Sequence, residues 1–381
     1  MSSASARAAS TGASRLCILH IATERGWRGG ERQALWLADW VQRLGHRCLL
    51  ATRPGESLWE RAEARDLERI AVSPRSEVDV GAVLRLRSAI VREGVQIVHA
   101  HTAHAVSLGA LATLRTAARM VVTRRVDFRL RTNTGSRWKY GRARALIAVS
   151  RAVAKVLEAA GVAPHRIHVI PDGVDLTRRI EPPSPHTLGV LGITPGRPLA
   201  VQVAALVPHK DPLTFVRAIA VARELAPSLQ ALMLGAGPLD AVVRTEIARL
   251  ELGGVVHLAG HREDADELMS AATVVTLSSE EEGMGSVLLD AAALGKPVAA
   301  TCAGGIPEVV RDGETGLLVA VRDPHALGLA IARLVADEAL AKRLGDAARQ
   351  RVQEFSMDRC ATRNVDVYER VLAGEGEGAV R

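Results

Sequence analysis

Aromatic residues are scarce in this sequence, since Phe, Trp and Tyr make up only 3% of its 381 residues. The hydrophobic cores must therefore rest on Val, Leu, Ile and Ala. Runs of these residues are typical of buried parallel strands, which lack a polar alternation. Apolar residues make up 48% of the chain, and its length exceeds what one ordinary core needs. We therefore expect two domains, each with a buried sheet.

Cysteines and long apolar runs are also scarce. The four cysteines form no CxxC pair and have no metal-ligand spacing; they are Cys17, Cys48, Cys302 and Cys360. We expect reduced thiols and a cytoplasmic protein. No apolar run reaches the length needed to span a bilayer. Residues 1–14 are rich in Ser and Ala and lack an apolar segment, so we expect a disordered tail and not a signal peptide.

Lysine is rare although the chain is basic. Only five of its 49 basic residues are lysines, and the net charge is +7. The segment 115–155 contains twelve basic residues and a single acid, with Trp138 and Tyr140 near its middle. Two functional interpretations remain open: peripheral contact with the anionic inner face of the cytoplasmic membrane, or binding of a phosphorylated acceptor. The alternative is a solvated basic face. Nucleic acid is disfavoured because the chain has no recognised binding module.

Apolar strand-like runs alternate with helical periodicity along the whole chain. This alternation predicts two doubly wound parallel sheets of the Rossmann-like α/β class. The expected strands are 15–22, 48–51, 95–100, 120–123 and 145–149 in the first half, and 199–205, 230–235, 255–259, 273–277, 297–301 and 317–320 in the second. Two C-terminal helices are expected at 324–336 and 338–355.

A proline-rich segment separates the two halves. Five prolines lie within 178–198, and Pro182, Pro183 and Pro185 resist both helix and sheet. We therefore place the domain boundaries as follows: tail 1–14, first domain 15–180, linker 181–198, second domain 199–355, and C-terminal helix and tail 356–381. The C-terminal helix is expected to cross back to the first domain.

The segment with the most candidate ligand-binding residues follows the expected strand 273–277. Gly283 and Gly285 allow a ligand to approach the backbone, and the unpaired amides of the next helical turn favour an anion such as a diphosphate. Glu282 lies just before this turn, and Asp290 lies two helical turns further on. Taken alone, the pattern equally fits a capped helix with a solvated acidic loop.

A second glycine turn follows the next expected strand. It is Ala303-Gly304-Gly305-Ile306-Pro307-Glu308, with Pro307 near the first helical position. Both turns would lie at the carboxyl edge of one parallel sheet, which is where such sheets bind ligands. Their proximity favours a shared binding site.

The order of these motifs resembles that of the family 4 glycosyltransferases, which are retaining enzymes with the two-domain GT-B fold. The motifs are Gly29-Gly30-Glu31-Arg32, His99-Ala100-His101-Thr102, Ile147-Ala148-Val149-Ser150, Ile170-Pro171-Asp172-Gly173-Val174-Asp175, Val207-Pro208-His209-Lys210-Asp211, Glu282-Gly-Met-Gly-(x)4-Asp290, Gly295-Lys296-Pro297-Val298, Gly304-Gly305-Ile306-Pro307-Glu308 and Gly313-(x)2-Gly316-Leu317-Leu318-Val319. The resemblance covers nearly the whole chain. It implies an acceptor-binding first domain and a nucleotide-sugar-binding second domain.

The resemblance also implies roles for single residues. Glu282 would contact the donor sugar, Lys210 the diphosphate leaving group, and Arg125 the phosphate, so these three are the candidate catalytic residues. Donor binding is assigned to Gly29, Gly30, Lys210, Glu282, Gly283, Met284, Gly285, Ser286 and Asp290. We place His101, Thr102, His104, Arg124 and Asp127 on the acceptor side of the cleft.

Three positions depart from the family pattern. Relatives usually have Glu where this chain has Asp290, and an Arg often accompanies the Lys where this chain has 204–206, Ala-Ala-Leu. Many relatives also have a His after the strand at 120–123, where this chain has Arg124 and Arg125. An arginine can bind phosphate but cannot act as a general base, because it keeps its proton.

We therefore expect a metal-independent retaining transferase with a front-side mechanism. It would use a nucleotide-diphosphate sugar, UDP-sugar in preference to GDP-sugar, and a cell-envelope glycolipid or polysaccharide as acceptor. No cofactor and no metal are expected; the triplet Asp264-Ala265-Asp266 fits a helix start better than a metal site. His99, His101 and His104 are expected to line the acceptor side. Two alternatives remain: a nucleotide-sugar 2-epimerase of the same fold, or a non-catalytic nucleotide-sugar-binding subunit.

Overall fold

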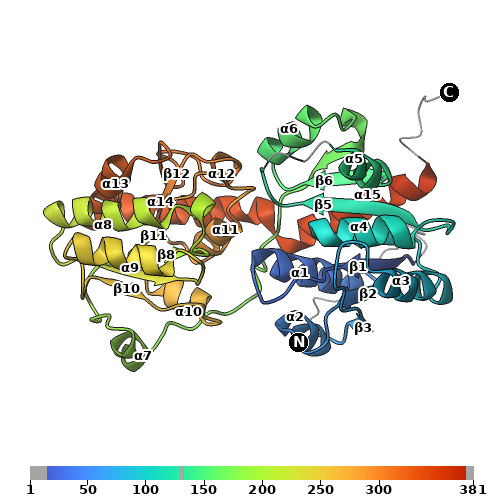
Figure 1. Ribbon diagram of the computed structural model, residues 1–381. Coiled ribbons are helices and arrows are strands. Elements are labelled where there is room, and N and C mark those ends of the chain that lie inside the picture. Colours follow the sequence, from blue (N-terminus) through green and yellow to red (C-terminus); the bar gives the residue numbers. More distant parts are fainter. Residues whose placement is uncertain (1–14, 129, 131–132, 375–381) are drawn as a thin grey trace, which may run out of the picture. The chain divides into compact units, whose positions relative to one another are not determined.

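The computed structural model describes residues 15–128, 130 and 133–374 (Figure 1). The tails expected at 1–14 and after residue 374 lie outside the described residues. Two parallel sheets flanked by helices confirm the predicted α/β fold. By their contacts, the residues divide into a first unit (1–122, 142–144 and 368–381) and a second unit (123–141 and 145–367).

The first sheet has seven strands in the order β3-β2-β1-β4-β5-β6-β7. The strands are β1 (Cys17–Ile21), β2 (Arg47–Thr52), β3 (Glu68–Ala71), β4 (Ile97–Ala100), β5 (Arg119–Arg124), β6 (Ala145–Ala148) and β7 (Ile167–Val169). The helices between them are α1 (Gly29–Arg43), α2 (Ser57–Glu63), α3 (Val80–Arg92), α4 (Ala103–Ala112), α5 (Thr134–Gly141) and α6 (Arg151–Ala159). Every β-strand of this sheet except β3 and β7 was expected.

The second sheet has six strands in the order β10-β9-β8-β11-β12-β13. The strands are β8 (Leu199–Val203), β9 (Gln230–Leu234), β10 (Val256–Leu258), β11 (Val274–Leu277), β12 (Val298–Thr301) and β13 (Leu317–Val319). The helices are α8 (Pro212–Leu225), α9 (Asp240–Arg249), α10 (Ala265–Ser270), α11 (Ser286–Ala293), α12 (Ile306–Val309), α13 (Pro324–Ala336), α14 (Glu338–Arg351) and α15 (Met357–Ala373).

The strand order places a switch point in each sheet. In the first sheet the chain builds outward from β1 to β3 and then returns to β4 beside β1. In the second sheet it builds outward from β8 to β10 and returns to β11 beside β8. Because parallel crossovers are right-handed, the reversal sends the following helices to the opposite face of the sheet. The loops after the two central strands then diverge and leave a crevice in which open α/β sheets bind ligands.

The linker prediction was wrong in one respect. A short helix, α7 (Pro185–Val190), lies inside the segment 181–198 that was expected to resist helix. Pro185 occupies the first helical turn, where a missing N–H is no loss, and Ser184 caps the helix by accepting a hydrogen bond from the Thr187 N–H at 3.0 Å. Proline therefore started a helix here and did not prevent one.

The C-terminal residues follow the expected course. The helix predicted at 338–355 is α14, which continues as a 3-10 turn over Val352–Phe355. In α15, the residues from Tyr368 onward belong to the first unit, as expected for a helix that returns to it. The Tyr368 side chain is fully buried and lies edge-on to the His99 ring.

Candidate active site

Lys210 and Glu282 meet at the switch point of the second sheet. Lys210 ends the 3-10 turn Pro208–Lys210 after β8, and Glu282 follows β11, the neighbouring strand. Their side chains form an ion pair and are 22% and 11% exposed, respectively. The sheet topology therefore brings together two of the three residues predicted to be catalytic, although 72 positions separate them in the sequence.

Further hydrogen bonds hold Glu282 in place. Ser279 Oγ donates to the Glu282 carboxylate at 3.2 Å, and the Glu282 N–H donates to the Asp127 carboxylate at 2.8 Å. The Gly305 N–H donates to the Glu282 carbonyl oxygen at 2.9 Å. Both glycine-rich turns and the loop after β5 thus converge on one carboxylate-bearing residue. Asp127, predicted for the acceptor side, here supports the Glu282 backbone.

The glycines of both turns are required by close backbone contacts. A Cβ on Gly283 would lie 1.9 Å from the Arg125 carbonyl oxygen, and one on Gly304 would lie 1.9 Å from the Glu282 carbonyl oxygen. Gly285 has a φ of 78°, which L-residues with a side chain rarely adopt, and it precedes the first residue of α11, Ser286. The first amides of α11, to which the sequence assigns an anion, thus directly follow a residue in the left-handed region.

Arg125 is engaged by an acid. Its Nε donates to the Asp172 carboxylate at 2.9 Å, with exposed fractions of 13% and 8% for the two side chains. The Asp172 N–H in turn donates to the Met284 sulfur at 3.3 Å. Met284 was predicted to bind the donor, but its side chain is buried. A ligand at this turn would therefore meet the Met284 backbone rather than its side chain.

Asp290 is buried on α11 and lines a cavity of about 350 Å³. Asp266 of α10 lines the same cavity and is paired with Arg178 at 2.7 Å. The other acid of the Asp-Ala-Asp triplet, Asp264, is paired with Arg262 at 2.6 Å, which lowers the pKa of its carboxyl. Both acids of the triplet are thus bound to arginines. Of the residues predicted to bind the donor, Asp290 is the one that lines this cavity.

His209 lies beside Lys210 in the same 3-10 turn. Its ring meets the edge of Phe128 at 5.0 Å between ring centroids. Burial, together with the nearby Lys210 charge, lowers the pKa of the His209 imidazole below its ordinary value. This environment therefore favours the neutral form of the ring.

The predicted residues of the first unit lie at the starts of two helices. Gly29 and Gly30 open α1, where Glu31 accepts a hydrogen bond from the Arg28 N–H at 3.1 Å, and burial raises the pKa of this carboxyl. Thr102 caps α4, because its Oγ1 accepts from the Ala105 N–H at 3.2 Å. Helix capping accounts for Thr102 without a ligand.

Two of the three histidines expected on the acceptor side, His99 and His101, belong to a buried group, and the third does not. His104 is 48% exposed and lies 3.4 Å from Glu24, away from the buried group. His20 of β1 takes its place beside His99 and His101. Sequence spacing could not reveal this, since β1 and β4 become neighbours only through the sheet order.

The basic segment 115–155 is only partly described, because Arg129 and Arg131 lie outside the described residues. Trp138 is 44% exposed, but Tyr140 is buried, so only the first of these two rings is free to lie at the membrane interface that one of the open interpretations requires. Arg124 donates to the Phe128 carbonyl oxygen.

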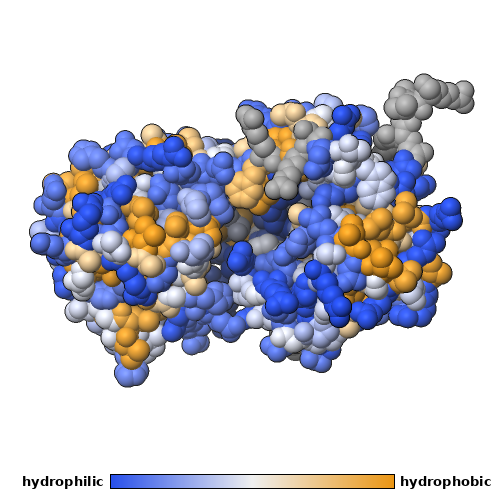
Figure 2. Space-filling view, in the orientation of Figure 1, coloured by the Kyte–Doolittle hydropathy of each residue, from blue (hydrophilic) through white to orange (hydrophobic). Residues whose placement is uncertain are grey.

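Figure 2 shows apolar side chains gathered on the surface of the first unit over α3, where Val80, Leu84 and Val91 are exposed.

Two residues that support the site had no assigned role in the sequence interpretation. Ser150 Oγ donates to the Gly283 carbonyl oxygen at 2.6 Å, and the Glu308 carboxylate accepts from the Arg151 and Ala152 N–H groups at 3.0 and 3.1 Å. Glu308 thereby neutralises the positive end of α6. Both residues lie in quoted motifs, but nothing in their spacing indicates these partners.

Two family models match the chain. "Glycosyltransferase Family 4" matches residues 27–178, and "Glycosyl transferases group 1" matches residues 187–351. The chain belongs to the family 4 glycosyltransferases. The resemblance inferred from the motifs is therefore confirmed.

Characterised relatives match part of this family 4 chain. It is 36% identical to α-maltose-1-phosphate synthase of Mycobacterium tuberculosis over 233 residues, which cover 55% of this chain and 58% of that protein. It is 32% identical to D-inositol 3-phosphate glycosyltransferase of Streptomyces griseus over 226 residues, which cover 56% of this chain and 48% of that protein. The chain thus spans about half the length of the curated relatives it matches.

Solved structures of the same fold cover nearly the whole chain. The crystal structure of Anabaena HepE in complex with UDP-glucose matches with a TM-score of 0.83 and 21% identity, over 93% of this chain and 100% of that one. Sucrose-phosphate synthase from Thermosynechococcus elongatus matches with a TM-score of 0.75 and 21% identity, over 95% and 100%. The predicted GT-B fold is confirmed. Within the described ranges, no helix is both long and apolar enough to cross a membrane.

Proposed function

We propose that this family 4 chain transfers a sugar from a nucleotide-diphosphate sugar to a hydroxyl group, with retention of configuration and without a metal. The observation that carries the proposal is the ion pair of Lys210 and Glu282 at the switch point of the second sheet. A cation and a carboxylate side by side match the two parts of such a donor: the diphosphate for Lys210 and the sugar hydroxyls for Glu282.

In this proposal the donor separates the ion pair. The diphosphate lies against the first amides of α11 and attracts Lys210, which leaves Glu282 able to accept hydrogen bonds from the sugar. Gly283 and Gly285 give the donor access to the backbone, Ser286 opens the helix, and Asp290 accepts from the ribose in its cavity. Gly29 and Gly30 of α1 are assigned to the phosphate side.

The chemistry proposed is front-side attack. The leaving diphosphate oxygen takes the proton from the acceptor hydroxyl as the new glycosidic bond forms and the bond to the diphosphate breaks. Lys210 stabilises the charge that develops on the diphosphate, and Arg125 contributes a second positive charge while Asp172 fixes its position. Arg125 replaces the histidine of many relatives and supplies charge but no general base.

A glycolipid or polysaccharide of the cell envelope is our proposed acceptor, reached at the inner face of the cytoplasmic membrane through the basic segment 115–155. UDP-sugar is favoured over GDP-sugar; the structural neighbour HepE was crystallised with UDP-glucose. The acceptor side is assigned to His101, Thr102, His104, Arg124 and Asp127. A small phosphorylated acceptor is a second candidate, favoured by the names of the relatives that make maltose 1-phosphate or act on inositol 3-phosphate.

Incubation of the purified chain with a panel of UDP- and GDP-sugars tests the activity. Slow donor hydrolysis that is unaffected by EDTA is expected, and an acceptor should convert it into transfer with an α-linked product from an α-donor, seen by NMR. Interconversion of two nucleotide sugars would instead indicate an epimerase, and binding without turnover a non-catalytic subunit. Co-sedimentation with anionic vesicles, compared with neutral ones, tests the membrane contact.

A further inference from the structure

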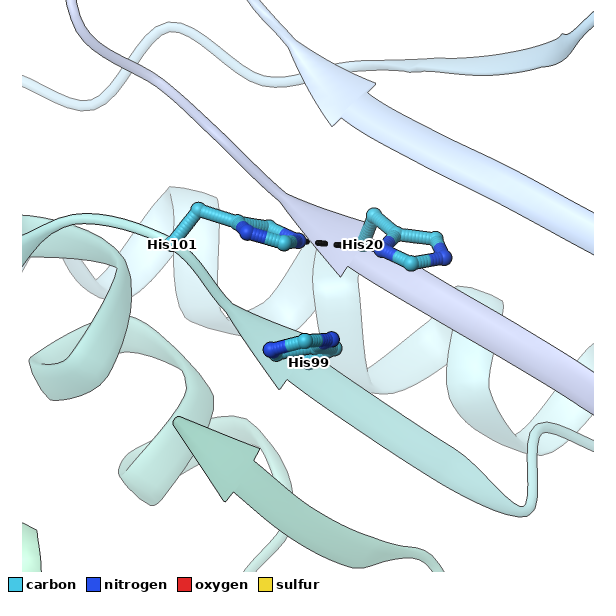
Figure 3. A group of neighbouring side chains, drawn as sticks. All are labelled: His20, His99 and His101. Carbon is cyan, nitrogen blue, oxygen red and sulfur yellow. Dashed lines mark hydrogen bonds between the residues drawn. The ribbon is translucent and has the colours of Figure 1, made fainter. Parts of the chain in front are cut away.

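Three histidines meet at the switch point of the first sheet. His20 of β1 and His99 of β4 are register partners on adjacent parallel strands, and His101 follows two residues later. His20 and His99 are fully buried and His101 is nearly so. Figure 3 shows the three rings turned toward one another across the two strands. This group lies at the carboxyl ends of β1 and β4, the edge at which open α/β sheets hold ligands.

The ring nitrogens are close enough to share one cation. One nitrogen from each histidine lies within 4.8 Å of the others, and His20 Nδ1 is 3.0 Å from His101 Nε2. The His99 and His101 rings are 4.2 Å apart between centroids. Because a hydrogen bond between two imidazoles needs one acceptor, at least one of them is neutral, and the neutral imidazole nitrogen is a metal ligand.

Tyr368 holds one of the three rings in position. Its hydroxyl is hydrogen-bonded to His99 Nδ1 at 2.6 Å, and the two rings meet edge-on. A polar partner at one ring nitrogen fixes the orientation and tautomer of a metal-binding histidine. Tyr368 lies on α15, so the C-terminal helix contributes the residue that positions His99.

We propose that His20, His99 and His101 form a binding site for a zinc-type divalent transition metal ion. Imidazole nitrogens favour zinc and its neighbours over magnesium or calcium, and three protein ligands leave one position open. A zinc–nitrogen distance of about 2.0–2.1 Å places ligand nitrogens roughly 3.3 Å apart, which small side-chain shifts from the present separations achieve. The ion replaces the His20–His101 hydrogen bond; the proton of that bond moves to the other nitrogen of its ring, or leaves if that ring carried two protons. The ion shares His101 with the proposed acceptor side but supplies no chemistry to the sugar transfer proposed above.

Cobalt titration of the full chain tests the site. The protein is freed of any polyhistidine tag and stripped with a chelator, and Co²⁺ is added while the visible spectrum is followed. We expect one Co²⁺ per chain with the absorption of a tetrahedral site, displaced by Zn²⁺. His20→Gln and His101→Gln should abolish the band. The matched control is His104→Gln, which removes a neighbouring exposed imidazole and should keep the band.

The outcomes that overturn the proposal are equally specific. They are no band in the wild-type chain, a band that survives both His20→Gln and His101→Gln, or loss of the band in His104→Gln. If circular dichroism shows that His20→Gln does not fold, the variants His101→Gln and Tyr368→Phe test the metal site instead. Tyr368→Phe should weaken Co²⁺ binding roughly 10–100-fold and keep the spectrum. Unchanged affinity in both variants refutes the site.

Discussion

The two switch points of this chain are built alike but are filled with opposite chemistry. In the first sheet, β1 and β4 bring together three buried imidazoles and a tyrosine hydroxyl. In the second sheet, β8 and β11 bring together the Lys210–Glu282 ion pair, and Arg125 is paired with Asp172 close to the same turn. The same topology therefore carries a hydrogen-bonded imidazole cluster in one sheet and paired charges in the other.

The difference indicates which kind of ligand the side chains at each switch point can bind. An ion pair at partial exposure can trade its partners for the charges of a ligand at little cost, because both states leave every charge compensated. The three imidazole rings instead favour a small ligand that accepts the lone pairs of their nitrogens, such as a metal ion. Charge pattern at the strand ends, and not the fold, thus decides what each sheet binds.

The largest expected effect comes from Glu282→Ala. We expect sugar transfer to fall roughly 100-fold or more while affinity for the nucleotide diphosphate stays nearly unchanged, because Glu282 is assigned to the sugar. Steady-state kinetics and calorimetric titration with UDP measure the two quantities. Glu281→Ala, which alters an exposed neighbour, is the control. An equal loss of diphosphate binding would contradict the assignment.

Gly283→Ala tests how tightly the loops are packed. The added Cβ would lie 1.9 Å from the Arg125 carbonyl oxygen, so the backbone must shift. We expect a loss of about 1–3 kcal/mol in the free energy of unfolding, measured by denaturant titration, together with reduced transfer. Gly253→Ala is the matched control, since its Cβ would meet no atom within 4 Å. Equal stability of the two variants would show that this contact is not rigid.

Lys210→Ala should weaken UDP binding roughly 10-fold, which corresponds to about 1.4 kcal/mol, because one charge-assisted contact to the diphosphate is lost. Calorimetric titration at low and high salt measures the change. The difference in UDP affinity between the wild-type chain and the variant should shrink as salt screens the charge. Lys342→Ala, which alters an exposed lysine of α14, should leave binding unchanged. An unchanged UDP affinity of the Lys210→Ala variant would contradict the proposed contact between Lys210 and the leaving diphosphate.

The smallest effect concerns His209, whose pKa is lowered from the ordinary 6.5 by burial and by Lys210. The unfolded chain therefore binds this proton at a higher pH than the folded chain. The resulting stability is fully present above pH 6.5 and is lost as the pH falls through the folded pKa. His209→Gln should flatten that part of the melting-temperature profile, whereas His165→Gln should not. Parallel profiles for all three proteins would exclude the linkage.

Local sequence patterns predicted the sheets well because most strands are short apolar runs between helical stretches. They missed β3 and β7, edge strands whose residues are only partly buried and whose sequences include Glu68 and His168. They also missed His20, which reaches His101 across 81 positions. Glycine turns predicted the backbone near Glu282, but its contact with Asp127 depends on tertiary packing that no spacing encodes.

The hydroxyl that meets His99 comes from Tyr368, 269 positions later in the chain. The ribosome therefore finishes β1 and β4 long before it supplies their last partner, and the entire second sheet is synthesised in between. Domains usually begin to fold in the order of synthesis. The first sheet of this protein gains Tyr368 only after the second sheet has been synthesised, so an N-terminal fragment ending before Tyr368 lacks a buried residue of the first unit.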